Sequence, residues 1–202
     1  VDYKSLKRLV EYQIDNGADF LCILATTGET PCLTQDEKDK ITQLVKDVNH
    51  GRLPILKGCG GNNTAAVVEE LRTADWSGID GILSVCPYYN KPSQEGLYQH
   101  FKAIAEASPL PVVLYNVPGR TGINLKPETT VRLANDCENI VAVKEASGSL
   151  EQVDEIIKNK PQRFDVLSGD DALTFLMVAC GAAGVISVIG NALPMEFSRM
   201  IC

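Results

Sequence analysis

Short, continuous apolar runs alternate strictly with helical patterns along the 202 residues of this chain. The runs are rich in Val, Ile and Leu and lack polar alternation, which is typical of strands buried on both faces of a parallel sheet. They cover residues 20–25, 53–56, 81–86, 111–115, 140–143, 164–167 and 184–189. Helical spacing is found in residues 2–16, 35–50, 63–75, 93–107, 127–136, 149–159 and 171–180. We therefore expect an α/β chain with parallel strands.

This alternation favours a (β/α)8 barrel over an open doubly wound sheet. A closed barrel needs eight strands and about 250 residues, whereas this chain begins on a helical pattern and ends on another, EFSRMIC. We therefore expect one barrel domain over residues 1–202 that lacks its first strand and its C-terminal helices. The open-sheet alternative would place a GxGxxG motif after a strand, and the glycines of residues 58–61 do not have that spacing.

Charge and cysteine content narrow the class of protein. The net charge of −7 argues against nucleic acid or an anionic membrane as a partner. The seven cysteines include no CxxC pair, so they indicate neither a disulfide framework nor a zinc site. Cys22, Cys86 and Cys180 lie in apolar segments, where we expect them to be buried. A reducing compartment, the cytoplasm, is the expected location.

The residues that follow the strands are candidates for chemistry, because barrel enzymes place catalytic groups at the C-terminal ends of their strands. These positions hold hydroxyl groups and a lysine but neither of the two histidines, and no metal-ligand spacing occurs. Lys144 follows residues 140–143. Desolvation lowers the pKa of a lysine and frees its amine to attack a carbonyl. The alternative is an ordinary lysine paired with Glu145 or Asp170, but Glu145 should point to the opposite face of the strand.

Other polar residues are expected at the same mouth of the barrel. Tyr115 ends the preceding strand, where its hydroxyl could transfer protons or simply pack the rim. Thr26 and Thr27 offer hydroxyl and N–H groups to a carboxylate. Arg120, after a Pro-Gly turn, is a candidate partner for a substrate carboxylate or a solvated loop residue. Lys57 also ends a strand and is the rival nucleophile, although the glycines after it suggest close backbone packing.

Several motifs resemble the dihydrodipicolinate synthase and N-acetylneuraminate lyase superfamily over the whole chain. In order, they are ATTGET, PYYNKPSQEGLYQHF, YNVPGRTG, VAVKEASG, LSGDD and GVISVIGN. Within the superfamily, the chain is most similar to the 4-hydroxy-tetrahydrodipicolinate synthase family. The resemblance implies a lyase that condenses pyruvate with aspartate-4-semialdehyde on the diaminopimelate route to lysine.

The resemblance also implies how the reaction proceeds. Lys144 would form the Schiff base, which removes Lys57 from that role. Thr26, Tyr89 and Tyr115 would form a proton relay. In such enzymes Tyr89 serves the active site of a neighbouring subunit, so the implied working unit is a homodimer, usually within a homotetramer. No cofactor is implied beyond the covalent imine between lysine and pyruvate.

Substrate-binding roles are implied for four more residues. Thr27 would hold the carboxylate of pyruvate, and Arg120 would bind that of the semialdehyde. Gly169 and Ile186 would line the pocket with their carbonyl groups. These roles would make pyruvate and aspartate-4-semialdehyde the partners of the chain.

Some features depart from the family pattern or leave alternatives open. Ala25 replaces a usual glycine, and Lys38 and Ala66 stand where a histidine and a glutamate are common in a lysine-binding site, so we expect weak or no inhibition by lysine. A sister aldolase acting on N-acetylneuraminate or a keto-deoxy sugar acid is the second hypothesis, although such lyases usually carry Ser-Thr at residues 26–27. A non-catalytic partial barrel is the third.

Overall fold

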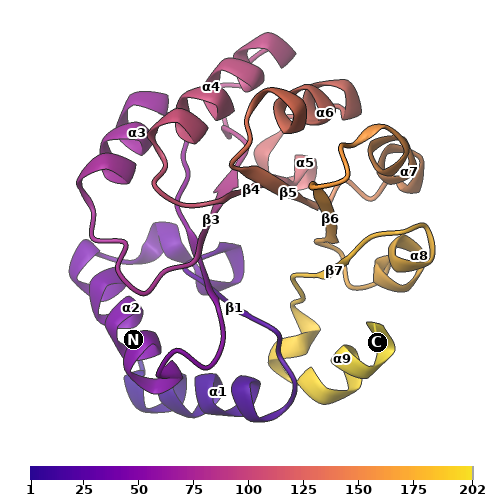
Figure 1. The fold of residues 1–202 in the computed structure, drawn as a ribbon. Coiled ribbons are helices and arrows are strands. Elements are labelled where there is room, and N and C mark those ends of the chain that lie inside the picture. Colours follow the sequence, from indigo (N-terminus) through magenta and orange to yellow (C-terminus); the bar gives the residue numbers. More distant parts are fainter. Residues whose placement is uncertain (202) are drawn as a thin grey trace. The chain divides into compact units, whose positions relative to one another are not determined.

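The computed structural model describes residues 1–201, in which helices alternate with seven strands as the sequence predicts (Figure 1). The chain forms two compact units. The first comprises Val1–Gly58, Trp76–Asp80 and Val188–Cys202, and the second comprises Cys59–Asp75 and Gly81–Ser187. The assignment of residues 1–202 to a single barrel domain stays a prediction.

Two parallel strands form the sheet of the first unit. Residues Leu21 and Ile23 of β1 pair with Ile55 and Lys57 of β2. Around them lie α1, which packs against α2, and shorter helical segments. The elements of this unit are α1 (Tyr3–Asp15), β1 (Leu21–Ile23), η1 (Thr26–Gly28), η2 (Thr30–Cys32), α2 (Gln35–Asn49), β2 (Ile55–Gly58), η3 (Ile189–Asn191) and α9 (Pro194–Ile201).

Local sequence explains where α2 begins. The Thr34 side chain accepts a hydrogen bond from the N–H of Glu37, and the Glu37 carboxylate accepts one from the N–H of Thr34. This reciprocal pair is a capping box, which satisfies N–H groups that have no partner within the helix. His50, at the other end, has a left-handed backbone conformation and caps the helix, so α2 ends one residue before the end of the predicted segment 35–50.

Five parallel strands, β3 to β7, pair in sequence order in the second unit. The pairing places Val85, Tyr115, Lys144 and Leu167 at the same level of neighbouring strands. The elements are α3 (Thr64–Thr73), β3 (Gly81–Val85), α4 (Gln94–Ala107), β4 (Val112–Asn116), α5 (Pro118–Thr121), α6 (Pro127–Asp136), β5 (Ile140–Glu145), α7 (Leu150–Asn159), β6 (Asp165–Ser168), α8 (Thr174–Ala179) and β7 (Gly184–Val185).

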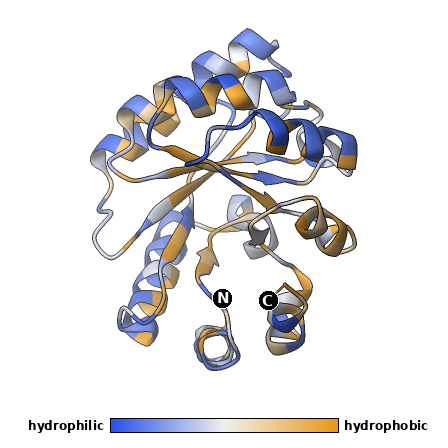
Figure 2. Ribbon diagram, turned by 45° about the vertical axis from the view of Figure 1, so that its right-hand side comes forward, coloured by the Kyte–Doolittle hydropathy of each residue, from blue (hydrophilic) through white to orange (hydrophobic). Residues whose placement is uncertain are grey.

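The core of the second unit lies between its strands and helices. In Figure 2, apolar colours are prominent on the strands, whereas the helices mix hydrophilic and apolar colours. Phe101, Leu133 and Ile156 place fully buried side chains from α4, α6 and α7 against this sheet. Each contributes roughly 1.5–3 kcal/mol by removing apolar surface from water.

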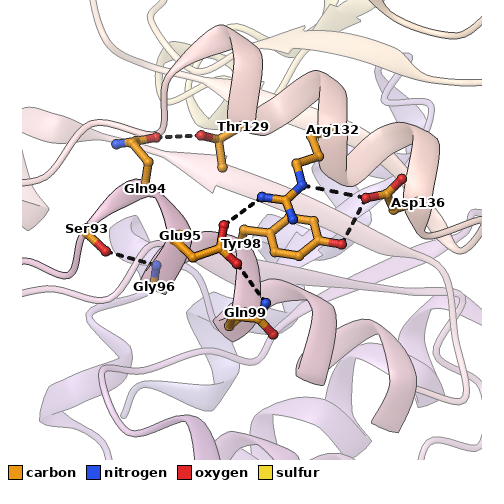
Figure 3. A network of polar contacts seen from close by, with 9 residues as sticks. All are labelled: Ser93, Gln94, Glu95, Gly96, Tyr98, Gln99, Thr129, Arg132 and Asp136. Atoms are coloured by element: carbon orange, nitrogen blue, oxygen red, sulfur yellow. Dashed lines mark hydrogen bonds and ion pairs between the residues drawn. The ribbon is translucent and has the colours of Figure 1, made fainter.

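Polar contacts join α4 to α6 on the outer surface of the second unit (Figure 3). The Arg132 guanidinium lies 3.5 Å from the centre of the Tyr98 ring and 2.6 Å from the carboxylate of Glu95. The hydroxyl of Tyr98 donates to Asp136 at 2.8 Å. The exposed ion pairs contribute little to stability by themselves, and they serve mainly to fix the relative positions of the two helices.

All seven predicted strands are present, but some boundaries differ. The first strand stops at Ile23, because Leu24 has a φ of +50° and cannot continue an extended strand. The last strand contains only Gly184 and Val185 of the predicted 184–189 segment. Among residues 1–201, no helix has the length and apolar character needed to cross a membrane.

Cysteine burial follows the prediction only in part. Cys86 is buried, as expected, and Cys22 is half-buried. Cys180 is exposed, contrary to the expectation, and lies at the C-cap of α8 rather than within the helix. Cys202 lies outside the described residues.

Candidate active site

Lys144 lies near the end of β5 and is the best-placed candidate nucleophile of the second unit. Its side chain is only 6% exposed, and its Nζ is 4.3 Å from the centre of the Tyr115 ring. Tyr115 is itself buried and pairs directly with Lys144 across β4 and β5. The structure therefore brings together the predicted Schiff-base lysine and one of its predicted proton carriers.

Gly169 limits the space around Lys144. A Cβ atom at Gly169 would lie 3.0 Å from Cε and 3.1 Å from Cγ of Lys144, and 2.8 Å from Cβ of Ala146. Real Cβ atoms do not approach other atoms to 2.8 Å, so a larger residue requires a shift of the neighbouring strand. Close packing therefore explains why residue 169 is a glycine, in addition to the predicted role of its carbonyl group in lining the pocket.

Ile186 is hydrogen-bonded to the carboxyl end of β6, next to Gly169. Its N–H donates to the carbonyl of Ser168 at 2.9 Å, and its side chain is buried. Gly169, the next residue after Ser168, donates its N–H to the carbonyl of Glu145 at 2.8 Å. The two predicted pocket residues are therefore held at the carboxyl end of β6, beside β5.

Arg120 lies on α5, a single helical turn that follows β4. Pro118 opens this turn, and Gly122 ends it with a φ of +73°. The predicted Pro-Gly turn is therefore a short helix. The buried hydroxyl of Thr121 fixes it by donating to the carbonyl groups of Val117 and Ile123, at 3.2 and 2.9 Å. Arg120 itself is exposed.

Tyr89 extends into solvent from the segment after β3. Its side chain is 88% exposed, and its φ of +74° is uncommon for a residue other than glycine. Hydrogen bonds hold the backbone around it: Asn62 donates to the carbonyl of Tyr88 at 3.1 Å, and Asn90 donates to that of Asn62 at 3.0 Å. A strained, well-anchored segment that presents an exposed aromatic ring is typical of a functional position.

Thr26 and Thr27 belong to the first unit, where they form η1. Thr26 is half-buried, and Thr27 is exposed. Residues with positive φ flank them, Leu24 at +50° and Glu29 at +48°. This motif therefore folds as two short 3-10 helices, and its unusual backbone is consistent with a binding segment.

Lys57, the rival nucleophile, lies on β2 of the first unit. It is also buried, with its Nζ 5.0 Å from the centre of the Trp76 ring. Both lysines therefore lie over an aromatic ring, but the indole offers no hydroxyl to move protons, in contrast to the phenol beside Lys144. The predicted close packing after Lys57 is found, because a Cβ atom at Gly58 would lie 1.9 Å from the carbonyl oxygen of Leu24.

The described residues offer no second site of this kind in a cleft or a metal centre. An open cleft of the first unit is lined by residues of both charges from α1, α2 and the segment after them, and none of the predicted site residues lines it. Residues 1–201 contain no group of three or more His, Cys, Asp or Glu side chains arranged to hold a metal ion. Lys144 with Tyr115 beside it stays the candidate for covalent chemistry.

Comparison with known proteins decides the family. The sequence model described as "Dihydrodipicolinate synthetase family" matches residues 1–202. The chain belongs to this family. Two relatives are the 4-hydroxy-tetrahydrodipicolinate synthases of Phocaeicola vulgatus, 64% identical over 99% of this chain and 67% of the relative, and of Parabacteroides distasonis, 62% identical over 100% and 68%.

Solved structures of dihydrodipicolinate synthases share the fold. One is the chloride-inhibited enzyme of Acinetobacter baumannii complexed with pyruvate, which has a TM-score of 0.94 and 44% identity over 98% of this chain and 68% of that one. This likeness confirms the predicted fold class, an α/β chain of the (β/α)8-barrel type. The family prediction made from the motifs is confirmed as well.

Proposed function

We propose that this dihydrodipicolinate synthase family member condenses pyruvate with aspartate-4-semialdehyde to give 4-hydroxy-tetrahydrodipicolinate, a step of lysine biosynthesis. The observation that carries the proposal is the buried pair of Lys144 and Tyr115, with Nζ 4.3 Å from the ring centre. The names of the relatives, at 64% and 62% identity, support the choice of reaction. The proposed location is the cytoplasm, and no cofactor is proposed.

Lys144 carries the covalent chemistry in this proposal. Its unprotonated amine attacks the C2 carbonyl of pyruvate to form a carbinolamine, which loses water to give an imine. Loss of a proton from C3 converts the imine to an enamine, whose C3 then forms a carbon–carbon bond with the aldehyde carbon of the second substrate. The aldehyde oxygen takes up a proton in this step. The amino group of the second substrate then attacks the imine carbon, which closes the ring as a cyclic imine and releases the amine of Lys144. Each stage moves a proton, and the hydroxyl of Tyr115, whose ring lies beside Lys144, is suited to this task.

The remaining residues take the roles that the family motifs assign. We propose that Thr26 and Tyr89 complete the proton relay with Tyr115, that Thr27 holds the carboxylate of pyruvate, and that Arg120 binds that of the semialdehyde. The 88% exposure of Tyr89 supports its proposed use by a second copy of the chain, in a homodimer or homotetramer. Gly169 and Ile186 would line the pocket through their carbonyl groups.

Borohydride trapping with pyruvate tests the proposal. Reduction should leave a stable pyruvate adduct on the peptide that contains Lys144, and Lys144→Ala should abolish it. Lys57→Ala is the matched control, since it removes another buried lysine from a strand end and should leave the adduct in place. An adduct on Lys57 would mean that the wrong lysine is assigned, and no adduct from folded protein would refute the mechanism.

A second assay distinguishes this synthase from a sister aldolase. Once the adduct is established, turnover is compared with aspartate-4-semialdehyde and with N-acetylmannosamine as the acceptor. We expect turnover with the semialdehyde alone, and Arg120→Ala should raise the KM for it more than that for pyruvate. Turnover with N-acetylmannosamine alone would keep the Schiff base but refute the assignment to lysine biosynthesis.

A further inference from the structure

Four polar side chains form a closed network on the helix-facing side of β4 and β5. Glu145 accepts hydrogen bonds from Gln152 at 2.9 Å, from Asn116 at 3.1 and 3.2 Å, and from the N–H of Ser147 at 2.7 Å. Asn124 accepts from Asn116 at 2.8 Å and donates to Gln152 at 2.8 Å. Strand β4, strand β5, helix α7 and the segment before α6 are thereby joined at one point.

The carboxylate at the centre of this network is almost completely buried, with Glu145 only 1% exposed. Every hydrogen-bond partner named above presents an N–H donor to it, as an ionised carboxylate requires. Burial first and Glu145 second raise the pKa of the Cys86 thiol, which directly follows β3. A buried carboxylate is tolerated only when its hydrogen bonds are satisfied, so the loss of one donor destabilises the fold. The positions of the donors around Glu145 are therefore held firmly.

The network touches the candidate active site through the backbone. Asn116 and Glu145 directly follow Tyr115 and Lys144, and each pair of residues is aligned across β4 and β5. Since neighbouring strand residues point to opposite faces, fixing the outer pair also fixes the orientation of the inner pair. Asn116 also accepts a hydrogen bond from the N–H of Leu125 at 3.0 Å, which anchors the far end of the segment that carries Arg120.

We propose that Glu145 and Asn116 are positioning residues for the Schiff-base reaction. From the helix-facing side of the sheet, their hydrogen bonds hold the ends of β4 and β5 in the register at which Tyr115 meets Lys144. This inference rests on the proposed function and adds to it two residues that do not contact the substrate.

Glu145→Gln tests the proposal with a side chain of nearly the same size. An amide has one acceptor oxygen where the carboxylate has two, and its NH2 group would face the donors of Asn116 or Gln152. We expect the rate of borohydride trapping of pyruvate on Lys144 to fall by about tenfold to a hundredfold, because small displacements of reacting groups lower reaction rates by factors of this size. Gln152→Ala, which removes one donor to Glu145 and the acceptor of Asn124 but keeps the carboxylate, is the milder variant should Glu145→Gln not fold.

Val153→Ala is the matched control, because it weakens the packing of the same helix through a buried residue that is outside the network. Its thermal midpoint should fall while trapping on Lys144 keeps its rate. The double variant Glu145→Gln with Gln152→Glu returns a carboxylate–amide pair to the network and should recover part of the lost rate. This rescue would not be expected from a loss of stability alone.

The outcomes separate this proposal from the proposed function. If the wild-type protein forms no adduct, the proposed function fails, and the positioning role fails with it. If the wild type reacts but Glu145→Gln and Gln152→Ala keep its trapping rate, only the positioning role is refuted. The positioning role is also refuted if the trapping rate of a network variant falls no more than that of Val153→Ala when the two variants have the same thermal midpoint.

Discussion

Replacing Gly169 by alanine should damage the site by crowding Lys144. The added Cβ would lie 2.8 Å from Cβ of Ala146 and 3.0 Å from Cε of Lys144. The lysine side chain can move aside, but Cβ of Ala146 is fixed to the backbone, so the end of β5 or β6 must shift. Overpacking of this kind costs about 1–3 kcal/mol. For a chain of this size, this corresponds to a decrease of roughly 2–12 °C in the melting temperature.

The effect on reactivity should exceed the effect on folding. A displacement of the order of 1 Å at reacting groups lowers rates by about a hundredfold, so we expect Gly169→Ala to slow pyruvate trapping on Lys144 by about tenfold to a hundredfold. The assay is the time course of the borohydride-reduced adduct by intact mass, measured on folded protein well below its melting temperature.

Gly148→Ala is the matched control for this experiment. Gly148 lies in the segment after β5 and has a φ of +80°, but a Cβ there would meet nothing within 4 Å. The left-handed conformation costs an alanine about 1–2 kcal/mol, so this variant should lose similar stability while Lys144 reacts normally. Trapping by Gly169→Ala at the wild-type rate would show that the tight contact with Lys144 does not control its reactivity.

Three further predictions concern other residues. Tyr115→Phe keeps the ring beside Lys144 but removes the hydroxyl, so pyruvate should still be trapped while kcat falls by about 10²–10⁴-fold; an unchanged kcat would exclude Tyr115 from the relay. Burial lowers the pKa of His100 to about 4 from its usual 6.5. The unfolded chain therefore takes up a proton first, and stability should decrease by up to about 3 kcal/mol as the pH falls from 6.5 to 4. Denaturant unfolding measured across this range should show that the free energy of unfolding of His100→Gln changes less with pH than that of the wild type. An equal change with pH in both proteins would mean that His100 is not the source of the effect. Lysine should inhibit turnover weakly or not at all, and half-maximal inhibition at a sub-millimolar concentration would overturn this expectation.

The strands were predictable because a strand buried on both faces leaves an unbroken apolar run. This signal located β3, β4 and β5 to within two residues at each end. It failed where the backbone, rather than hydrophobicity, ends the strand: Leu24 is apolar but has a φ of +50°. Likewise, the sequence after Val185 stays apolar, yet only Gly184 and Val185 pair with β6. Periodicity describes which side chains are buried and carries no information on the hydrogen bonds that define a strand.

The site was predictable to the extent that strand ends identify it. The end of each apolar run indicated Tyr115 and Lys144, and their pairing across neighbouring strands follows from the parallel order. The alternation of side chains also predicted that Glu145 points away from Lys144, which agrees with its bonds to Gln152 and Asn116.

What the sequence could not supply is the set of partners of that buried carboxylate. Asn116 and Glu145 are separated by 29 residues along the chain, and their contact depends on the register between β4 and β5. A register shift by one residue would turn Lys144 to the helix-facing side and Glu145 to the other. Such a shift would bury the charges of both residues without their present partners. The network is therefore both a consequence of the correct register and a reason why other registers are disfavoured, which is why a residue that never touches the substrate can determine where the reacting lysine points.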